Sequence, residues 1–375
     1  MVRVSTTRPL RIVIAGGGTG GHVFPALAIE QAMVARAPDA RVIFAGTRHG
    51  LEARVVPQHG KTLRTLWIAG FARGRILSNV LLPIKLVVSL MQSWWLLITF
   101  RPNLVIGTGG YVMGPVLWTA QRLGIPTLLQ EQNSLPGYTS KKLAPRAAVV
   151  CIGFEDARAH LKSQRIEVTG NPLRVSFHAL DRAAARAAWP LMEGRPTLLV
   201  FGGSAGARSI NRAVGAGLPR LIEMCNVIWQ TGKLGLPDTV SRDAVDAAVT
   251  AKQLVVREFI DDMPSAYAAT DLALCRAGAI TLAELAMAGL PAILVPYPFA
   301  ADDHQTANAN SFVTAGAAIL VRDAELSADT LIRAVAHGLS SDTERHRMSE
   351  AVKSLARPDA AARIAEIALS IANRS

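Results

Sequence analysis

A histidine that follows a run of glycines is the first feature that could do chemistry. Gly16–Gly21 comes after an apolar segment, and His22 stands where a helix is expected to begin. The positive potential at a helix start disfavours imidazolium, so the neutral ring there can accept a proton as a general base. The alternative is a histidine that only closes the turn by hydrogen bonding.

The same run contains the dinucleotide pattern Gly-x-Gly-x-x-Gly, which is weak by itself. An NAD site also needs an acid at the end of the second strand, and Phe44–Thr47 supply none. A phosphate-binding P-loop needs Gly-Lys-Ser or Gly-Lys-Thr, whereas this run ends in Gly21-His22. The turn can offer backbone N–H groups to an anion, but neither cofactor is supported.

Three more glycine turns follow apolar segments, at Gly107–Tyr111, Gly202–Ala207 and Arg276–Thr281. Each could be a simple strand-to-helix connection, but together they indicate several phosphates to be held. The chain contains no Asp-x-Asp pair, so the usual carboxylate clamp for a metal-bound nucleotide sugar is missing. We therefore expect backbone N–H groups and helix dipoles to stabilise a leaving diphosphate.

Short apolar runs alternate with Ala- and Leu-rich helical stretches, which predicts parallel sheets covered on both faces. The first half contains Arg11–Ala15, Arg41–Ala45, Leu104–Ile106, Thr127–Gln130, Val149–Ile152 and Ile166–Val168; the second contains Thr197–Phe201, Val227–Gln230, Leu254–Arg257, Leu272–Cys275, Ala292–Val295 and Ala318–Val321. No clear strand lies between Gly170 and Pro196. We expect two α/β domains, 1–172 and 173–357, with ligands at the carboxyl ends of the strands, and a C-terminal helix in 358–375 packing back on the first domain.

The charge of the chain is uneven. Of its 375 residues, the first 170 carry 20 Lys and Arg against 7 Asp and Glu, while the remainder carry 20 against 21. The first half is expected to meet a phosphorylated substrate or an acidic membrane, unless it is only a solvated basic surface. Nucleic acid is not favoured, because no basic run is interleaved with aromatic residues. Three cysteines without CxxC spacing indicate a reducing cytoplasm and no zinc site.

The segment from Leu81 to Phe100 is almost continuously apolar and is predicted to be one helix. Spacings of three and four place Leu81, Ile84, Val88, Met91, Trp95 and Ile98 on one face, with Lys85, Ser89, Gln92 and Thr99 on another. After Pro83 and Lys85 it is shorter than the roughly 20 residues that span a bilayer. It is either a core helix or a helix whose apolar side touches the membrane interface, with Arg73, Arg75 and Lys85 nearby.

Motifs along most of the chain resemble one enzyme family. They are Gly17–Ala28, Gly109-Gly110-Tyr111, Glu131-Gln132-Asn133, Gly170–Arg174, Gly202-Gly203-Ser204, Glu258–Met263, Arg276–Glu284 and His304–Ala309. In this order they resemble the MurG family, bacterial transferases that move N-acetylglucosamine from UDP-GlcNAc to the muramyl-pentapeptide pyrophosphoryl-undecaprenol lipid of peptidoglycan synthesis.

The resemblance implies a GT-B glycosyltransferase with two Rossmann-like domains. The second domain would hold UDP-GlcNAc, and the first would meet the acceptor lipid and the anionic membrane surface. The transfer would be inverting, to the 4-hydroxyl of the muramyl sugar. It implies a peripheral protein at the cytoplasmic face of the inner membrane, with no nucleic-acid partner and no required cofactor, although a divalent cation stays open.

The resemblance also implies roles for individual residues by matching position. His22 would be the base, and Glu131 is the second residue expected to be catalytic. At the donor, Ile260 would meet uracil through its backbone, Glu284 would bind the ribose, and the contacts with the diphosphate and sugar would come from Ser204, Ala279, Ile280, Thr281, Leu282, His304, Gln305, Asn133 and Arg174. Thr19, Gly20 and Gly21 would lie against the donor sugar and the acceptor pyrophosphate, which Gly18, Gly109, Gly110 and Tyr111 would also bind.

Some alternatives remain. Glu284 could instead cap its helix, and Asn133 could be a plain turn residue. Ala205 stands where the family usually has Gln, and Phe299 where it often has His. A nucleotide-sugar epimerase of GT-B fold is the nearest alternative function; a nicotinamide dehydrogenase and a non-catalytic membrane scaffold are others.

Overall fold

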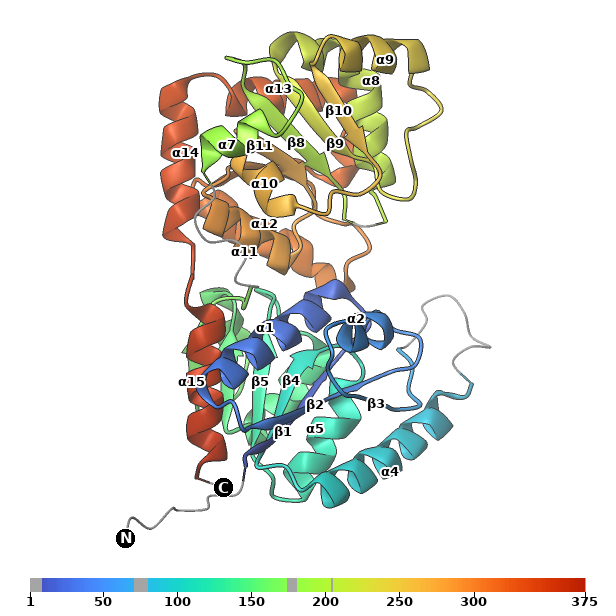
Figure 1. The fold of residues 1–375 in the computed structure, drawn as a ribbon, viewed down its shortest axis with the longest axis vertical. Helices are drawn as coiled ribbons and strands as arrows, with labels where there is room; N and C mark the ends of the chain where they lie inside the picture. The colour runs from blue at the N-terminus through green and yellow to red at the C-terminus, as the bar shows by residue number, and fades with distance from the viewer. Residues whose placement is uncertain (1–8, 71–79, 174–180, 204, 375) are drawn as a thin grey trace. The chain divides into compact units, whose positions relative to one another are not determined.

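The computed structural model describes residues 9–70, 80–173, 181–203 and 205–374. The chain divides into two compact units (Figure 1): unit 1 is Met1–Arg174 with Pro358–Ser375, and unit 2 is Val175–Arg357. The division falls inside the strand-free segment, and the chain returns to unit 1 at Pro358.

Unit 1 is built on a seven-stranded parallel sheet in the order β3-β2-β1-β4-β5-β6-β7. Its strands are β1 (Arg11–Gly16), β2 (Arg41–Gly46), β3 (Leu63–Thr65), β4 (Leu104–Gly109), β5 (Thr127–Glu131), β6 (Val149–Ile152) and β7 (Ile166–Val168). Its helices are α1 (Gly20–Arg36), α2 (Glu52–Gln58), α4 (Leu82–Phe100), α5 (Met113–Arg122), α6 (Tyr138–Leu143) and α15 (Ala360–Ala372), with short 3-10 turns at Ala144–Arg146 and Glu155–His160.

Alternate residues of each strand enter separate cores on the two faces of this sheet. Ile12 and Ile14 pack with residues of α1 and α15 on one face, while Val13 and Ala15 pack with residues of α5 on the other. Figure 1 shows α15, the last helix of the chain, lying beside α1, the first. Because both faces are covered, the strands have to be apolar throughout, which is the pattern that the sequence displays.

Unit 2 repeats the plan with a six-stranded parallel sheet in the order β10-β9-β8-β11-β12-β13. The strands are β8 (Thr197–Phe201), β9 (Asn226–Gln230), β10 (Leu254–Arg257), β11 (Leu272–Cys275), β12 (Ala292–Leu294) and β13 (Ala318–Leu320). The helices are α7 (Arg182–Ala187), α8 (Arg208–Met224), α9 (Arg242–Thr250), α10 (Met263–Ala268), α11 (Ala279–Ala288), α12 (His304–Thr314), α13 (Ala328–Gly338) and α14 (Asp342–Ser354), with 3-10 turns at Ala301–Asp303 and Asp323–Glu325. The predicted α/β class is confirmed for both units.

One strand of unit 1, β3, was not predicted from the sequence. β3 is three residues long and carries Arg64 between Leu63 and Thr65, so Leu63 is its one apolar residue. It pairs with the end of β2 at the edge of the sheet, where one side of the backbone needs no partner.

The helix α4 turns its polar stripe toward the protein and its apolar stripe outward. The buried residues are Ser89, Ser93 and Leu97, and the two serine hydroxyls donate to carbonyls of their own helix, Ser89 to Leu86 and Ser93 to Ser89. Met91 and Trp95 on the opposite stripe are 66% and 64% exposed. The alternative of a core helix is therefore wrong.

Candidate active site

The ring of His22 is held by the turn that precedes it. Its Nδ1 lies 2.9 Å from the carbonyl oxygen of Gly17 and 3.2 Å from Oγ1 of Thr19. A carbonyl can only accept, so Nδ1 carries the proton and the lone pair is on Nε2. Thr19 is the N-cap of α1, and its carbonyl accepts from the backbone N–H of His22. The side chain is thereby ordered as a base that uses Nε2.

The turn after β4 packs directly against this histidine. Thr108 donates its hydroxyl to the carbonyl of His22 at 2.9 Å. A Cβ on Gly109 would lie 2.9 Å from Nε2 of His22, and Gly109 and Gly110 both have positive φ, at 106° and 80°. The ring of Tyr111 lies 3.3 Å from where a Cβ on Gly18 would be. The structure thus brings His22 together with the residues predicted at the acceptor pyrophosphate.

The backbone N–H of Gly18, a residue predicted at the acceptor pyrophosphate, already has an acceptor within the protein. It donates at 2.8 Å to Oε2 of Glu52, whose Oε1 accepts from the N–H and hydroxyl of Thr47. Glu52 is 1% exposed. Sequence spacing cannot show that the carboxylate of Glu52, the first residue of α2, folds back under the glycine turn, and a contact of Gly18 with the acceptor pyrophosphate stays a prediction.

Glu52 is the residue of this region that sequence reasoning missed. Burial acts to raise the pKa of its carboxyl, but hydrogen bonds from Gly18 and Thr47 outweigh that effect and lower the pKa. Glu52 is therefore ionised at neutral pH. The available signal was an acid shortly after the second strand, beyond the Phe44–Thr47 segment.

Glu131, at the end of β5, faces its own loop. Its Oε1 accepts from the backbone N–H and side-chain amide of Asn133, and its Oε2 accepts from the N–H of Gly137. The side chain is 4% exposed. These contacts make it a brace that fixes Asn133, and the catalytic role remains a prediction. Asn171 accepts from Gln130 and donates to the carbonyl of Gln132, so the Gly170–Arg174 motif secures the same loop.

In unit 2, the start of α11 carries the residues predicted at the diphosphate. Its N-cap, Gly278, gives no side-chain cap, and Ala279, Ile280 and Thr281 form the first turn. The first backbone N–H groups of a helix have no carbonyl partner within the helix, and they create positive potential. Leu282 does not fit its predicted role, because its side chain is 0% exposed and its N–H donates to Gly278 at 2.9 Å.

Glu284 is oriented by a tyrosine and does not cap its helix. The hydroxyl of Tyr267 donates to Oε2 of Glu284 at 3.0 Å. Burial, together with the nearby Glu284 charge, raises the pKa of Tyr267 well above its usual value, so the phenol stays a donor. The capping alternative is wrong, because Glu284 lies well inside α11, past its first turn. A ribose diol could bind the carboxylate that Tyr267 orients.

Ile260 is buried, and its backbone N–H donates at 2.9 Å to Oε1 of Gln230. The amide nitrogen of Gln230 donates to the carbonyl of Gly203 at 3.2 Å. Gln230, which our sequence analysis did not single out, thus ties the glycine turn after β8 to the predicted uracil contact. Backbone recognition of uracil at Ile260 would then have to use its carbonyl.

His304 and Gln305 begin α12. Nδ1 of His304 lies 2.7 Å from the carbonyl of Ala301, and Oε1 of Gln305 accepts from the N–H of Tyr297 at 2.9 Å. The two residues before them, Asp302 and Asp303, are both left-handed with φ of 53°. Such strain in non-glycine residues gathers at binding sites. The helix is tied to the α11 turn by Asn308, whose amide donates to the carbonyl of Ala277.

Two predicted contacts, Arg174 and Ser204, lie outside the described residues. Ala205 and Phe299, where the chain departs from the family pattern, are both exposed. Among the residues that the structure describes, no three His, Cys, Asp or Glu side chains gather where they could hold a metal ion.

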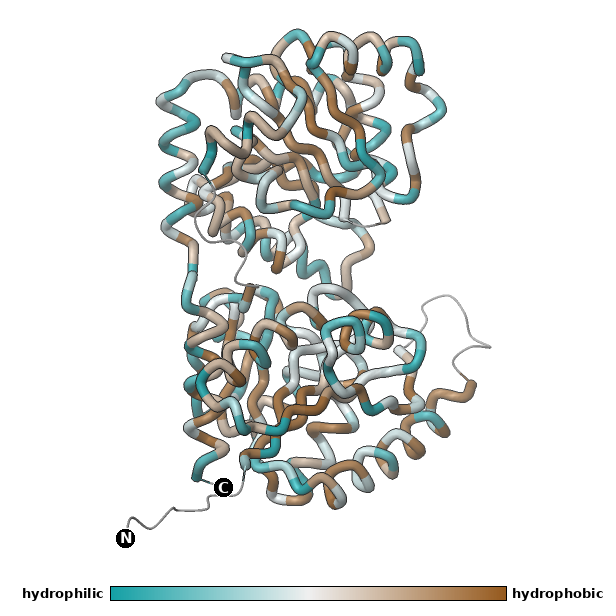
Figure 2. Tube along the Cα trace, viewed as in Figure 1, coloured by the Kyte–Doolittle hydropathy of each residue, from teal (hydrophilic) through white to brown (hydrophobic). Residues whose placement is uncertain are grey.

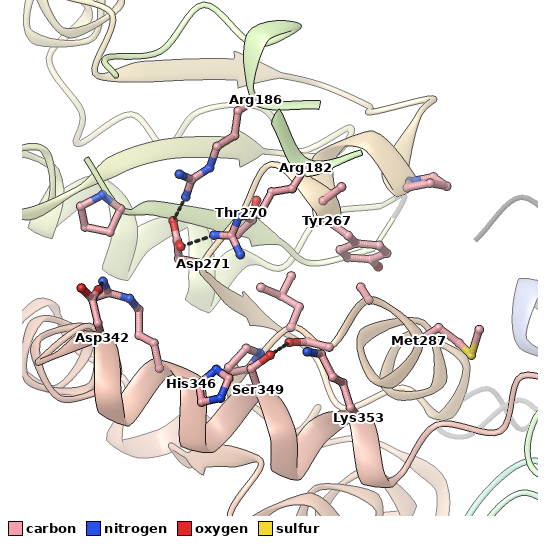
Figure 3. A pocket seen from close by; sticks show the side chains of 18 of the residues that line it. Arg182, Arg186, Tyr267, Thr270, Asp271, Met287, Asp342, His346, Ser349 and Lys353 are labelled. Atoms are coloured by element: carbon pink, nitrogen blue, oxygen red, sulfur yellow. Dashed lines mark hydrogen bonds and ion pairs between the residues drawn. The ribbon is translucent and has the colours of Figure 1, made fainter. Parts of the chain in front are cut away.

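A pocket of about 750 Å³ in unit 2 contains none of the predicted site residues. Figure 3 shows its lining: Arg182 and Arg186 reach the carboxylate of Asp271 from α7, and His346, Ser349 and Lys353 face them from α14. Both arginines are paired with the one carboxylate of Asp271, which offsets part of the positive charge of this wall.

The fold and these sites define a class. Two Rossmann-like units, each built on a parallel sheet with glycine turns that lead into helices, are those of a GT-B glycosyltransferase. The family model of the glycosyltransferase family 28 N-terminal domain matches residues 12–152, and that of the family 28 C-terminal domain matches residues 197–364. The chain therefore belongs to glycosyltransferase family 28.

Individual relatives cover nearly the whole chain. A Salinibacter ruber protein named UDP-N-acetylglucosamine--N-acetylmuramyl-(pentapeptide) pyrophosphoryl-undecaprenol N-acetylglucosamine transferase is 43% identical over 98% of this chain and 99% of its own. An Exiguobacterium protein of the same name is 42% identical over 96% and 98%. The crystal structure of Acinetobacter baumannii MurG, 29% identical, superimposes with a TM-score of 0.77 over 96% of this chain and 100% of that one. None of these relatives supports the epimerase alternative.

Proposed function

We propose that this chain transfers N-acetylglucosamine from UDP-GlcNAc to the lipid-linked muramyl-pentapeptide that the names of its relatives specify. Full-length identity of about two residues in five to proteins with that activity carries the proposal. The geometry of His22 supports it, since an acceptor hydroxyl has to lose its proton during transfer.

The chemical step assigns the proton to Nε2 of His22. As the 4-oxygen of the muramyl sugar forms its bond to the anomeric carbon of N-acetylglucosamine, its proton passes to Nε2. The bond from that carbon to the diphosphate oxygen breaks, and UDP leaves with the electron pair. Attack opposite the leaving group inverts the configuration at the anomeric carbon. General-base assistance of this kind contributes about 10²–10⁴ in rate.

Unit 2 is proposed to bind the donor. The first turn of α11, with Thr281, would stabilise the diphosphate as charge develops on it. The carboxylate of Glu284, oriented by Tyr267, would bind the ribose hydroxyls. The carbonyl of Ile260 would meet uracil, and His304 and Gln305 the sugar. The acceptor pyrophosphate in unit 1 would be bound by Thr19–Gly21, Gly109, Gly110 and Tyr111, without the N–H of Gly18.

Unit 1 is proposed to associate with an anionic membrane through α4. By length and composition this is the one helix in the described part of the chain that could cross a membrane, yet it packs along α5 with only 17% of its most apolar window buried. Figure 2 shows hydrophobic residues along it. A groove of about 980 Å³ beside it is lined by Met91, Trp95 and Arg64, among others. Apolar side chains would enter the interface while basic ones meet lipid phosphates.

The proposal includes a peripheral location at the cytoplasmic face of the membrane, and binding to vesicles tests it. Vesicles containing phosphatidylglycerol should bind the wild type, and raising salt should release it, because exposed charges are screened beyond about 10 Å at 0.1 M. Met91→Ser with Trp95→Ser should abolish binding at any salt. Phe299→Ser, at an equally exposed aromatic residue in unit 2, is the matched control and should bind normally.

We also propose that no metal ion is required, since helix starts and backbone N–H groups can stabilise the leaving diphosphate. Turnover should then persist in EDTA. Loss of turnover in EDTA and its return with Mg²⁺ would contradict this part of the proposal.

The test of the function is incubation with labelled UDP-GlcNAc, with and without the lipid-linked acceptor. Sugar transfer that depends on the lipid is expected. Formation of free sugar product without lipid would favour an epimerase and overturn the transferase.

A further inference from the structure

We propose that Glu52 is a positioning residue that holds and polarises His22 through the Gly17–Gly18 peptide group. This inference deepens the proposed function, since it takes His22 to be the base. It assigns a task to the buried carboxylate that the mechanism above leaves unused.

The two hydrogen bonds that carry the inference belong to one peptide group. Its N–H, from Gly18, donates to Oε2 of Glu52 at 2.8 Å, and its carbonyl, from Gly17, accepts from Nδ1 of His22 at 2.9 Å. Carboxylate, peptide and imidazole therefore form an unbroken chain. In hydrolases an aspartate pairs directly with the histidine, whereas here one peptide group stands between them.

A charge at one end of such a chain is felt at the other. Hydrogen bonds in series polarise one another, so a carboxylate on the N–H draws electron density toward the carbonyl oxygen. That oxygen becomes a stronger acceptor for Nδ1–H and stabilises the positive charge that the ring gains when Nε2 takes a proton. No proton moves to Glu52. The effect is electrostatic and orientational.

Packing keeps the chain rigid and partly shielded from water. Glu52 is 1% exposed, and a Cβ on Gly17 would lie 2.5 Å from its Oε1. On the other side, a Cβ on Gly110 would collide with the carbonyl oxygen of Gly17. The peptide is thus clamped between the carboxylate and the β4–α5 turn. In such surroundings a charge acts more strongly than in water.

Few other charged groups compete in this region. The hydrogen-bond partners of Glu52 are neutral: Gly18, and Thr47 through its N–H and hydroxyl. The same loop carries Arg48 and His49, both exposed. The β4–α5 turn adds the phenol of Tyr111, and the next titratable residue of α1 after His22 is Glu30.

The experiment compares pH profiles of kcat/KM for lipid-dependent transfer in the wild type and Glu52→Gln. The variant keeps the size of the side chain but loses the charge, so imidazolium becomes less favourable. The midpoint of the acid limb, the pH at which kcat/KM has fallen to half on the acidic side of the profile, is expected to move to lower pH by about half to one unit. Turnover should fall about tenfold, with unchanged affinity for UDP.

Glu30→Gln is the matched control. Glu30 is also a buried carboxylate, 3% exposed, on the same helix as His22, but it pairs with Lys61 at 2.7 Å and has no contact with the glycine turn. The variant is expected to leave the acid limb in place. If Glu52 is purely structural, both variants should lose stability and neither should change the midpoint of the acid limb of kcat/KM. That result would overturn the proposal.

A second measurement does not depend on a variant folding. In ¹⁵N-histidine-labelled wild type above the acid limb, NMR should show the proton of His22 on Nδ1, with the signal assigned by its loss in His22→Ala. A proton on Nε2 would overturn the proposal outright. If His22→Ala keeps full activity, His22 is not the base and that part of the proposed function is wrong. If His22→Ala is inactive while Glu52→Gln has the same pH profile as the wild type, only the proposed role of Glu52 is wrong.

Discussion

The glycine turns after β1 and β8 occupy the same place in two similar sheets, yet their surroundings differ in one respect. In unit 1 the side chain that secures the turn is the carboxylate of Glu52, which takes the N–H of Gly18. In unit 2 it is the amide of Gln230, which donates to the carbonyl of Gly203. The carboxylate occupies a backbone N–H of the turn in unit 1, whereas the amide nitrogen occupies a backbone carbonyl of the turn in unit 2.

The difference separates two kinds of chemistry on one fold. In unit 2 Gln230 takes no N–H of the turn, although the N–H of Gly206 donates to the carbonyl of Gly203, and a turn whose N–H groups are not taken by a carboxylate suits a leaving diphosphate. A turn with a buried carboxylate beneath it is poorer at holding an anion but can support a base, because negative charge favours imidazolium. We infer that the strand-turn-helix unit positions the turn, and that the residue beneath the turn decides whether the turn binds an anion or supports a base.

The sharpest test of this comparison removes the base. His22→Ala should lower turnover by about 10²-fold or more, because the acceptor hydroxyl loses its proton acceptor. Affinity for UDP, measured by calorimetry, should stay within about twofold, since unit 2 is unchanged. Near-normal turnover would remove the chemical distinction between the turns.

A second test adds a methyl group to one glycine of each unit. Gly110 and Gly203 both have positive φ, at 80° and 84°, but only at Gly110 would a Cβ collide, with the carbonyl of Gly17. Both alanine variants bear a backbone cost of roughly 1–2 kcal/mol. Gly110→Ala should additionally lose tenfold or more in kcat by displacing the acceptor of His22. Equal kcat values would show that the clamp on Gly17 is unimportant.

A third test gives unit 2 the carboxylate of unit 1. In Gln230→Glu the oxygen that accepts from Ile260 is kept, but the donor to Gly203 is lost and a negative charge is added near the proposed diphosphate site. UDP affinity should fall about tenfold, as expected for an uncompensated charge next to an anion. Gln230→Ala, which adds no charge, is the comparison and should weaken UDP less.

The smallest expected effect is on stability. Because the pKa of Glu52 is lowered in the folded chain from 4.5, its carboxylate stabilises the fold above that pH, and this contribution is lost as pH falls through the lower value. Urea unfolding of the wild type and Glu52→Gln should differ most at pH 7 and converge only once the pH has fallen through the lowered pKa of Glu52. A constant difference at all pH values would mean that the stabilising contacts do not depend on the charge.

The apolar texture and glycine turns predicted most of the fold. Buried parallel strands such as Thr197–Phe201 are recognisable because they are mostly apolar and are followed directly by glycine. The edge strand β3 and the orientation of α4 were beyond this pattern. Ser89 and Ser93 face inward only because their hydroxyls satisfy themselves within the helix, which leaves the larger apolar residues outside.

The sequence by itself determined the two α/β units, the turn-borne His22 and membership of a glycosyltransferase family, because those depend on local pattern and ordered motifs. The tertiary structure alone decided which polar groups are already occupied: Gly18 by Glu52, Ile260 by Gln230, Glu284 by Tyr267. The partners in these pairs are 17 to 34 positions apart, and nothing in the local sequence fixes such contacts. Two of the contacts arise where segments that follow neighbouring parallel strands meet at one edge of a sheet, and the third arises where α10 packs against α11.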